Sequence, residues 1–210
     1  MKLLIATQNP GKFAEISEVL KSVSDLQLFS LVELKLHDEV EEHGETHEAN
    51  AMLKAQYFFK KTGLPTLGED SGIEVDAFPG ELGVQTRRWE GLAKATDEQW
   101  VKYFLEKMET FLPSRRGAKF ICYAAIILDE KSFGNPFIFS GETRGVITEK
   151  LEAPLKAGIP ISSCFRPDGF EKVYAALTVN EKNRVSHRGK AMASVRDFLA
   201  QKSIMEKIGV

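Results

Sequence analysis

The sequence predicts an α/β fold, and three observations lead to it. Residues 3–6 form a continuous apolar run, residues 13–23 carry apolar side chains at helical spacing, and residues 26–32 form a second strand-like segment. This strand, helix, strand order is typical of an α/β sheet, which binds ligands at the carboxyl ends of its strands. The chain has 210 residues, 43% hydrophobic and 28% charged, which is ordinary globular composition. Because no repeat or long linker interrupts it, we expect one domain with two lobes over residues 1–210.

The charge balance and the apolar runs argue against two classes of partner. The 28 basic and 30 acidic side chains leave a net charge of −2, whereas nucleic acids and anionic membranes attract a surplus of Lys and Arg. The longest apolar run, residues 120–128, is far shorter than the roughly 18 residues of a membrane span. Cys122 and Cys164 have no metal-ligand spacing and form no disulfide framework. We therefore expect a protein of the reducing cytoplasm with neither a nucleic-acid nor a membrane partner.

The first half of the chain alternates strands, helices and one polar loop. The turn at Asn9-Pro10-Gly11 separates the first strand from the helix that carries Phe13 and Ile16. Residues 37–48 are acidic and lack an apolar period, so we expect a loop whose surface carries the histidines His37, His43 and His47. A helix is predicted over residues 48–61, with Lys54 off the apolar side that is formed by Met52, Leu53 and Tyr57.

The second half adds strands and two longer helices. Residues 65–76 predict two short strands around a tight turn flanked by glycines. Thr96 and Gln99 have the spacing of a capping box, which begins a helix that runs to about Met108. Residues 120–128 and 136–147 predict strands, and residues 186–203 predict a final helix with Ala191 and Val195 facing inward.

The turn after the first strand has the features of an anion site. It consists of Thr7, Gln8, Asn9, Pro10, Gly11 and Lys12. Pro10 and Gly11 can turn the backbone so that its amides face outward, a helix N-terminus adds partial positive charge, and Lys12 adds a full charge. It is not a P-loop, because Ala6 and Phe13 replace the glycine and the Ser/Thr of that motif. The alternative is a polar turn that only caps the helix.

A second candidate site is the run of carboxylates in residues 69–76. Glu69, Asp70, Glu74 and Asp76 lie within eight positions, and like charges this close raise one another's pKa unless a cation offsets them. A divalent ion with oxygen ligands would do so, and the acidic loop at residues 39–48 could add a ligand. Strand alternation places Glu69 on the face opposite Asp70. The alternative is a solvated hairpin with a charged outer face.

The third candidate site is the cationic segment at residues 181–190. It places Lys182, His187 and Arg188 at the start of the last predicted helix, where the helix dipole disfavours positive charge. A bound anion would remove this conflict. Arg188 suits bidentate contact with a phosphate or a base edge, and Lys182 suits a point contact. His187 could act as an acid, a base or a simple donor, or it could merely be solvated.

Four motifs in this order resemble the non-canonical purine nucleoside triphosphate pyrophosphatases, the Ham1-like family. The family's T/S-x-N-x-x-K matches residues 7–12 (TQNPGK), and its N-A-x-x-K-A matches residues 50–55 (NAMLKA). Its E/D-D-S-G-L-x-V-D resembles residues 69–76 (EDSGIEVD), and its S-H-R-G-K-A matches residues 186–191. The resemblance extends over about residues 1–200.

The resemblance implies a fold and a reaction. The fold would be an elongated, two-lobed α/β domain with a mixed, strongly twisted central sheet, flanking helices and a cleft between the lobes, usually in a homodimer. The reaction would be hydrolysis of a nucleoside triphosphate to a monophosphate and diphosphate with Mg²⁺. The substrates would be deaminated purine nucleotides such as ITP, dITP and XTP, which the enzyme would remove from the precursor pool.

The resemblance also implies residue roles. Residues 7–12 would hold the triphosphate, with Lys12 in a catalytic role, and Ser71 would contact the nucleotide. Asp70 would bind the metal or activate water, and Glu41 would be the second metal ligand, with Glu42 as the alternative. Positive charge would also come from Lys54 and Lys182, and the purine 6-oxo edge would be read by His187 and Arg188.

The base-recognition segment departs from the family pattern. The favoured alignment places Ile159 where the family has a Phe that stacks on the base, and Ser162 where it has an Asp. A rival alignment would instead use residues 165–168. Aromatic stacking of a base contributes on the order of 1–3 kcal/mol. We therefore expect a weaker or shifted base preference, and the alternatives are a nucleotide-binding protein or a phosphohydrolase of different base specificity.

Overall fold

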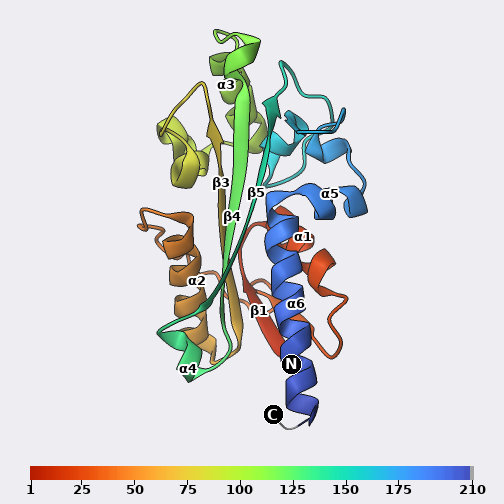
Figure 1. Ribbon diagram of the computed structural model, residues 1–210. Coiled ribbons are helices and arrows are strands. Elements are labelled where there is room, and N and C mark those ends of the chain that lie inside the picture. Colours follow the sequence, from red (N-terminus) through yellow and green to blue (C-terminus); the bar gives the residue numbers. More distant parts are fainter. Residues whose placement is uncertain (209–210) are drawn as a thin grey trace.

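The computed structural model describes residues 1–208 and shows an elongated molecule built on one curled, mixed six-stranded sheet (Figure 1). The strand order is β2-β1-β3-β4-β5-β6. β1 pairs in parallel with β2 and β3, and the pairs from β3 to β6 are antiparallel. The strands are β1 (Lys2–Ala6), β2 (Gln27–Ser30), β3 (Thr66–Val75), β4 (Gly117–Ile127), β5 (Phe137–Ile147) and β6 (Phe165–Pro167).

Helices cover both faces of the sheet. The α-helices are α1 (Pro10–Leu20), α2 (His47–Thr62), α3 (Asp97–Met108), α4 (Glu130–Phe133), α5 (Val179–Val185) and α6 (His187–Ile208). Short 3₁₀ segments connect them: η1 (Gly83–Lys94), η2 (Pro113–Arg115), η3 (Pro160–Ser163) and η4 (Tyr174–Ala176). The predicted strand, helix, strand order of the first 30 residues is confirmed, and so is the capping box of Thr96 and Gln99 at the start of α3.

The long strands β3, β4 and β5 run through both lobes (Figure 1). In the lobe that holds both termini, α1 and α6 pack on one face of the sheet against Leu67, Cys122 and Ala124, whereas α2 packs on the other face against Ala125 and Ile127. The other lobe has its own aromatic core, in which Trp100, Phe104, Phe165 and Tyr174 are almost fully buried. The predicted two-lobed α/β architecture is therefore confirmed.

Three sequence expectations are wrong, each for a physical reason. Residues 66–75 form one continuous strand without a turn, since Gly68 and Gly72 allow neighbouring backbone to approach the strand closely. The buried side of α2 is formed by Ala51, Lys54, Ala55, Phe58 and Phe59, so Lys54 faces the sheet while Tyr57 is exposed. A helix break at Ser186 separates α5 from α6, so Lys182 lies in the last turn of α5, where the helix dipole favours a cation.

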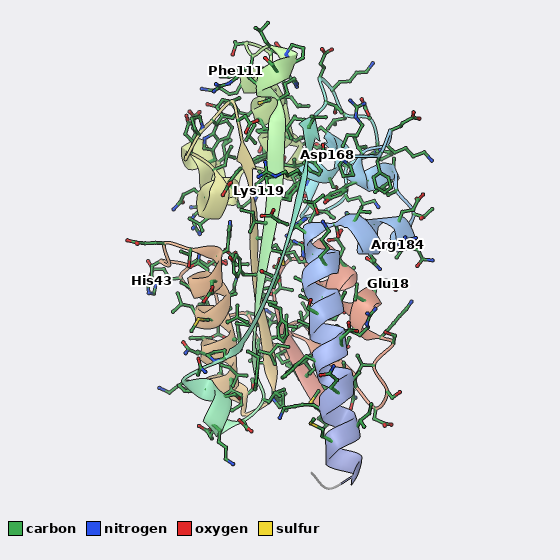
Figure 2. All side chains as sticks on the ribbon, in the orientation of Figure 1. Glu18, His43, Phe111, Lys119, Asp168 and Arg184 are labelled. Carbon is green, nitrogen blue, oxygen red and sulfur yellow. The ribbon has the colours of Figure 1, made fainter. Side chains whose placement is uncertain are left out.

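The predicted surface loop is only partly correct. His43 projects from the surface beside α2 (Figure 2). Asp168 and Arg184 project from the surface in another part of the molecule (Figure 2). His37 is also exposed. His47 is not on the surface, because it begins α2 and is only 7% exposed. Within residues 1–208, no helix has the length and apolar character needed to cross a membrane.

The packing of α2 on β3 depends on Gly68. A Cβ atom at this position would lie 2.2 Å from the carbonyl oxygen of Ala51 and 2.7 Å from the amide nitrogen of Ala55. Both atoms belong to the helix backbone, so they cannot move aside independently. We predict that Gly68→Ala lowers the free energy of unfolding by on the order of 1–3 kcal/mol, as overpacking does. Urea unfolding measures this, with Gly134→Ala as the control because no atom lies within 4 Å of its Cβ position. Equal stability of the two variants would contradict the prediction.

Candidate active site

A cleft of about 660 Å³ opens where β1 stops and β3 continues. The last pair between these strands is Ala6 with Gly68, so residues 69–75 extend beyond the end of β1. The chain after Ala6 turns into α1 at this point, so the edge of β3 beyond Gly68 has no neighbouring strand on the side of β1. Side chains from both faces of β3 lie near this unpaired edge. Lys12 and Asp70 both line the cleft, so these distant segments of the chain meet at one hollow.

Eleven of the predicted site residues line the cleft: Thr7, Gln8, Asn9, Pro10, Lys12, Lys54, Asp70, Ser71, Lys182, His187 and Arg188. Gly11 and Glu41 are not among its lining residues. Gly11 lies inside the first turn of α1, where a Cβ would be 2.5 Å from the carbonyl oxygen of Ala157. Its small size therefore serves close packing against this neighbouring segment.

Asn9 connects the turn at the start of α1 with the other lobe. Its Oδ1 accepts a hydrogen bond from the amide of Lys12 at 3.0 Å, which caps the helix, and Pro10 occupies the first helical turn. Its Nδ2 donates to the carbonyl of Gly158 at 2.7 Å, and the amide of Gly158 donates to Asp97 Oδ2 at 2.6 Å. The alternative interpretation of residues 7–12, a polar turn that caps the helix, is therefore correct for Asn9. The same turn also forms part of the wall of the cleft.

Glu69 and Asp70 point to opposite faces of β3, as strand alternation predicts. Glu69 is 1% exposed and pairs with Lys12 at 2.9 Å and with Arg188 Nε at 3.1 Å. Burial opposes its charged form, but the charges of Lys12 and Arg188 outweigh burial and hold the pKa of Glu69 well below its usual value. Glu69 therefore remains ionised and already has two cationic partners.

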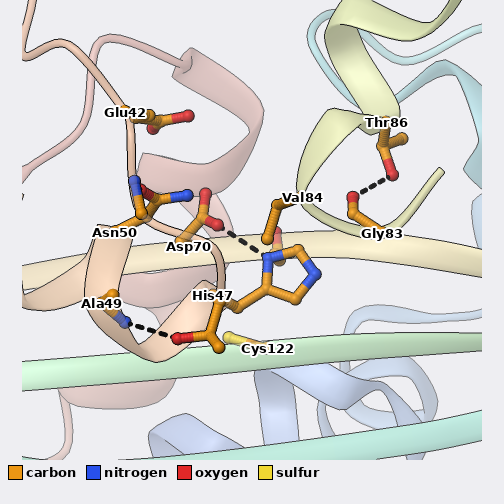
Figure 3. Close-up of polar contacts among 12 residues, drawn as sticks. Glu42, His47, Ala49, Asn50, Asp70, Gly83, Val84, Thr86 and Cys122 are labelled. Carbon is orange, nitrogen blue, oxygen red and sulfur yellow. Dashed lines mark hydrogen bonds and ion pairs between the residues drawn. The ribbon is translucent and has the colours of Figure 1, made fainter. Parts of the chain in front are cut away.

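Asp70 is held by groups from α2 (Figure 3). Its Oδ2 lies 2.7 Å from His47 Nδ1, and its Oδ1 lies 3.2 Å from Lys54 Nζ. Burial opposes the charge of Asp70 as well, but the hydrogen bond from His47 and the positive charges of Lys54 and Lys12 lower its pKa to about 2. The pKa values of this pair do not rise, because each carboxylate has its own cationic or hydrogen-bonding partners, which offset the charges as the sequence interpretation required.

Glu42, and not Glu41, lines the cleft, as do the acidic loop residues Asp38 and Glu39. Glu42 Oε1 accepts a hydrogen bond from Lys54 Nζ at 2.6 Å, and its Oε2 lies 3.3 Å from Arg88 Nη1. Glu41 is exposed. The geometry therefore favours Glu42, the alternative at the sequence level, as the partner of Asp70.

The donor set around Lys54 suits a hard divalent cation. Carboxylates from Glu42 and Asp70 converge on one ammonium group, and Lys54 Nζ occupies the position between them. Magnesium in nucleotide sites is commonly bound by one or two carboxylates, with water and phosphate oxygens as the other ligands. Among the described residues, no group of three or more His, Cys, Asp or Glu side chains forms a complete protein cage for a metal.

A second ion network lies on the α1 and α6 side of the cleft. Glu15 of α1 pairs with Lys182 Nζ at 2.5 Å and with Arg188. Arg188 is 3% exposed, and its Nη2 donates to Ser71 Oγ at 2.8 Å. Burial and the nearby charge of Arg188 lower the pKa of Lys182, although Glu15 opposes this effect. In the structure, Arg188 thus organises the wall of the cleft through Glu15, Glu69 and Ser71.

Aromatic side chains line the end of the cleft where the base-recognition segment lies. The ring of His187 stacks on Phe120, with centroids 4.6 Å apart and an interplanar angle of 11°. Tyr174 packs beside both rings, with its centroid 5.8 Å from that of Phe120 and 6.1 Å from that of His187. Ile159 lines the cleft, and so does Ser162, whose hydroxyl donates to the carbonyl of Ile159 at 2.6 Å. The cleft therefore retains an aromatic lining in Trp100, Phe120 and Tyr174 despite the aliphatic residue at position 159.

Four residues of the cleft region escaped the sequence interpretation: Glu15, His47, Arg88 and Trp100. Arg88 lies outside the four matched motifs, and Glu15 and Trp100 resemble ordinary helix residues. His47 lies three residues before the motif at residues 50–55 and directly before the predicted helix. Its position at the start of that helix was the signal that could have identified it.

His187 gives the stability of the protein a defined pH dependence. Burial and the charge of Arg188 lower its pKa well below 6.5, so the folded protein holds it neutral while the unfolded chain binds a proton below that pH. The stabilisation is complete above about pH 6.5 and is lost as the pH falls toward the lower folded-state pKa. We predict that Tm falls less between about pH 7.5 and about pH 5 in His187→Phe than in the wild type. Calorimetry of both proteins checks this, and parallel curves would contradict it.

Known proteins share the sequence pattern and the fold of this chain. The sequence matches the model of the Ham1 family over residues 3–198. It is 36% identical to the dITP/XTP pyrophosphatase of Mycobacteroides abscessus over 201 residues, which cover 95% of both chains. It is 38% identical to the protein of the same name from Thermus thermophilus, over 93% of this chain and 90% of the other. A HAM1 protein structure from Coxiella burnetii superposes with a TM-score of 0.80 at 31% identity, covering 96% of this chain and 99% of that one. The chain belongs to the Ham1 family.

Proposed function

We propose that this protein is a nucleoside triphosphate pyrophosphohydrolase, which converts NTP and water to NMP and diphosphate. Its relatives carry the name dITP/XTP pyrophosphatase, and we extend that substrate class, with ITP, to this chain. The observation that carries the proposal is the convergence of Lys12 and Asp70 on one cleft with basic side chains from several elements. Phosphoryl transfer requires positioning and charge stabilisation more than covalent chemistry, and this cleft offers both.

The phosphate end of the cleft lies at the start of α1. Its first turn contributes backbone amides and partial positive charge, and Lys12 contributes a full charge. Lys54 and Lys182 add further charges from α2 and α5. In the free protein each of these cations is paired with a carboxylate, so a polyphosphate would replace carboxylate oxygens as their partner. This exchange keeps the cations paired, and the displaced carboxylates then require other cationic partners.

Glu42 and Asp70 are the residues that would hold Mg²⁺. The ion, when bound, supplies a Lewis acid that neutralises charge developing on the attacked phosphoryl group. Asp70 lies within reach of the same position as Glu42, since both carboxylates contact Lys54 Nζ. We therefore assign Asp70 to holding the ion. Lys54, displaced from between the two carboxylates, is then free to contact phosphate oxygens.

The base end would distinguish purines through its aromatic wall and its unpaired polar groups. His187 Nδ1 and Tyr174 Oη are buried and make no hydrogen bond within the described part of the chain. Both groups belong to residues that line the cleft. We propose that His187, with Arg188 beside it, reads the 6-oxo edge, while the loss of a stacking ring at Ile159 shifts preference among bases. A homodimer in the cytoplasm remains the expected form of the enzyme.

Product analysis tests the proposed reaction. Purified protein with Mg²⁺ is incubated separately with ITP, dITP, XTP, GTP and dUTP, and the products are separated by ion-exchange chromatography. We predict a monophosphate and diphosphate in equal amounts, with the deaminated purines as preferred substrates. Asp70→Asn should abolish turnover while the protein remains folded, because the amide cannot supply an anionic ligand. Orthophosphate as the first product, or binding without turnover, would contradict the proposal.

Arg88 provides a separate test of the phosphate end. Its guanidinium lies 3.3 Å from Glu42 Oε2 and lines the cleft from η1, in the lobe opposite α1. If it contacts the diphosphate portion, Arg88→Gln should weaken inhibition by inorganic diphosphate by roughly 10–150-fold, which corresponds to one charged hydrogen bond of about 1.5–3 kcal/mol. Inhibition by IMP should not change. Arg115→Gln is the control, since Arg115 is exposed and donates to the carbonyl of Asp76 away from the cleft. Equal inhibition constants for both variants would remove Arg88 from the site.

A further inference from the structure

His47 is a buried histidine that neither the motifs nor the proposed reaction uses. It is the first residue of α2, directly after Thr46, whose hydroxyl caps the helix by accepting a hydrogen bond from the amide of Ala49 at 3.1 Å. The imidazole lies beneath Val84 of η1 and over β3 (Figure 3). A Cβ at Gly72 would be 2.8 Å from His47 Cε1, so glycine at this position leaves room for the ring.

The ring makes one polar contact, and its direction can be deduced. Nδ1 lies 2.7 Å from Asp70 Oδ2, and the ionised carboxylate of Asp70 can only accept a hydrogen bond. Nδ1 therefore carries the hydrogen and donates it. Nε2 is buried and has no partner among the described residues. The ring is thus held in place for a single interaction, and that interaction is with the carboxylate at the centre of the site.

We propose that His47 is a positioning residue for Asp70, with the function of keeping one carboxylate oxygen facing the cleft. With Oδ2 bound to His47, Oδ1 is the oxygen that remains for the cation, and at present it faces Lys54 Nζ at 3.2 Å. Glu42 approaches the same ammonium from the other side at 2.6 Å. This inference rests on the proposed function, in which Asp70 and Glu42 hold Mg²⁺ at that place.

Two other roles for His47 fit the structure less well. It does not line the cleft, so it has no access to substrate or to an attacking water. A role in packing alone would be satisfied by any ring of similar size and would not require a donor 2.7 Å from a charged oxygen. Groups that orient a metal ligand from behind typically change metal affinity or activity by about 10–100-fold when they are removed.

The experiment compares three substitutions at position 47. Electron paramagnetic resonance measures the affinity of each variant for Mn²⁺ in the absence of nucleotide. His47→Phe keeps a ring but removes the donor, and we expect it to weaken Mn²⁺ binding by about 10–100-fold. His47→Asn places an N–H close to the position of Nδ1 and should restore most of the affinity. His47→Gln places its N–H near Nε2 and should not. His37→Phe, an exposed histidine of the neighbouring loop, is the control for the same chemical change.

The outcomes separate this inference from the proposed function. Wild-type Mn²⁺ affinity in His47→Phe overturns the inference, and so do equal affinities of the Asn and Gln variants. If His47→Phe does not fold, the comparison of Asn with Gln decides the question, because both are polar and differ mainly in where the N–H lies. With ITP, the loss should appear in kcat and in the Mg²⁺ concentration needed for half activity, with little change in KM. Absence of ITP hydrolysis by the wild type would refute the proposed function and leave the Mn²⁺ comparison intact.

Discussion

Two adjacent buried carboxylates on one strand impose the arrangement of this molecule. Glu69 and Asp70 follow each other along β3 and therefore face opposite sides of the sheet. A buried charge is tolerated only when it is paired and hydrogen-bonded, so each face must supply cations. On one face Lys12 and Arg188 reach Glu69 from α1 and α6, and on the other Lys54 and His47 reach Asp70 from α2. This requirement places helices with cationic side chains on both faces of the sheet, and these side chains form the charged cleft.

The cleft is electrically balanced before any substrate arrives. Glu15 pairs with Lys182 and Arg188, Glu69 also pairs with Arg188, and Glu42 pairs with Lys54 and Arg88. These carboxylates keep the basic groups ordered in the absence of phosphate, which reduces the entropy that binding must otherwise overcome. They also compete with phosphate for the same cations. Phosphate binding is therefore favourable only when another positive charge binds Glu42 and Asp70 in place of the cations that phosphate takes from them. This is the physical reason why a divalent ion and a polyphosphate belong together in the proposed mechanism.

Local signals predicted most of the fold, and long-range contacts account for the errors. Apolar periodicity was sufficient for β1, α1 and the capped helix α3, because the pattern and the caps agree there. The glycines of β3 suggested a turn, because glycine is common in turns. Gly68 instead allows α2 to approach the strand closely, and this contact cannot be seen in the neighbouring sequence. Most of the motif residues do meet at the cleft, but the partners that hold them do not follow from spacing. His47 resembled a surface histidine because its carboxylate partner lies 23 positions away in the chain.

The hydrogen-bonded chain from Asn9 through Gly158 to Asp97 has a mechanical consequence. It connects the first turn of α1 directly to the N-terminus of α3, across the mouth of the cleft. β3, β4 and β5 also join the lobes, because they continue from one lobe into the other without a loop at which a hinge would form. Widening the cleft would therefore require a change of twist along these paired strands. It would also require breaking the hydrogen bonds that Gly158 makes with Asn9 and Asp97.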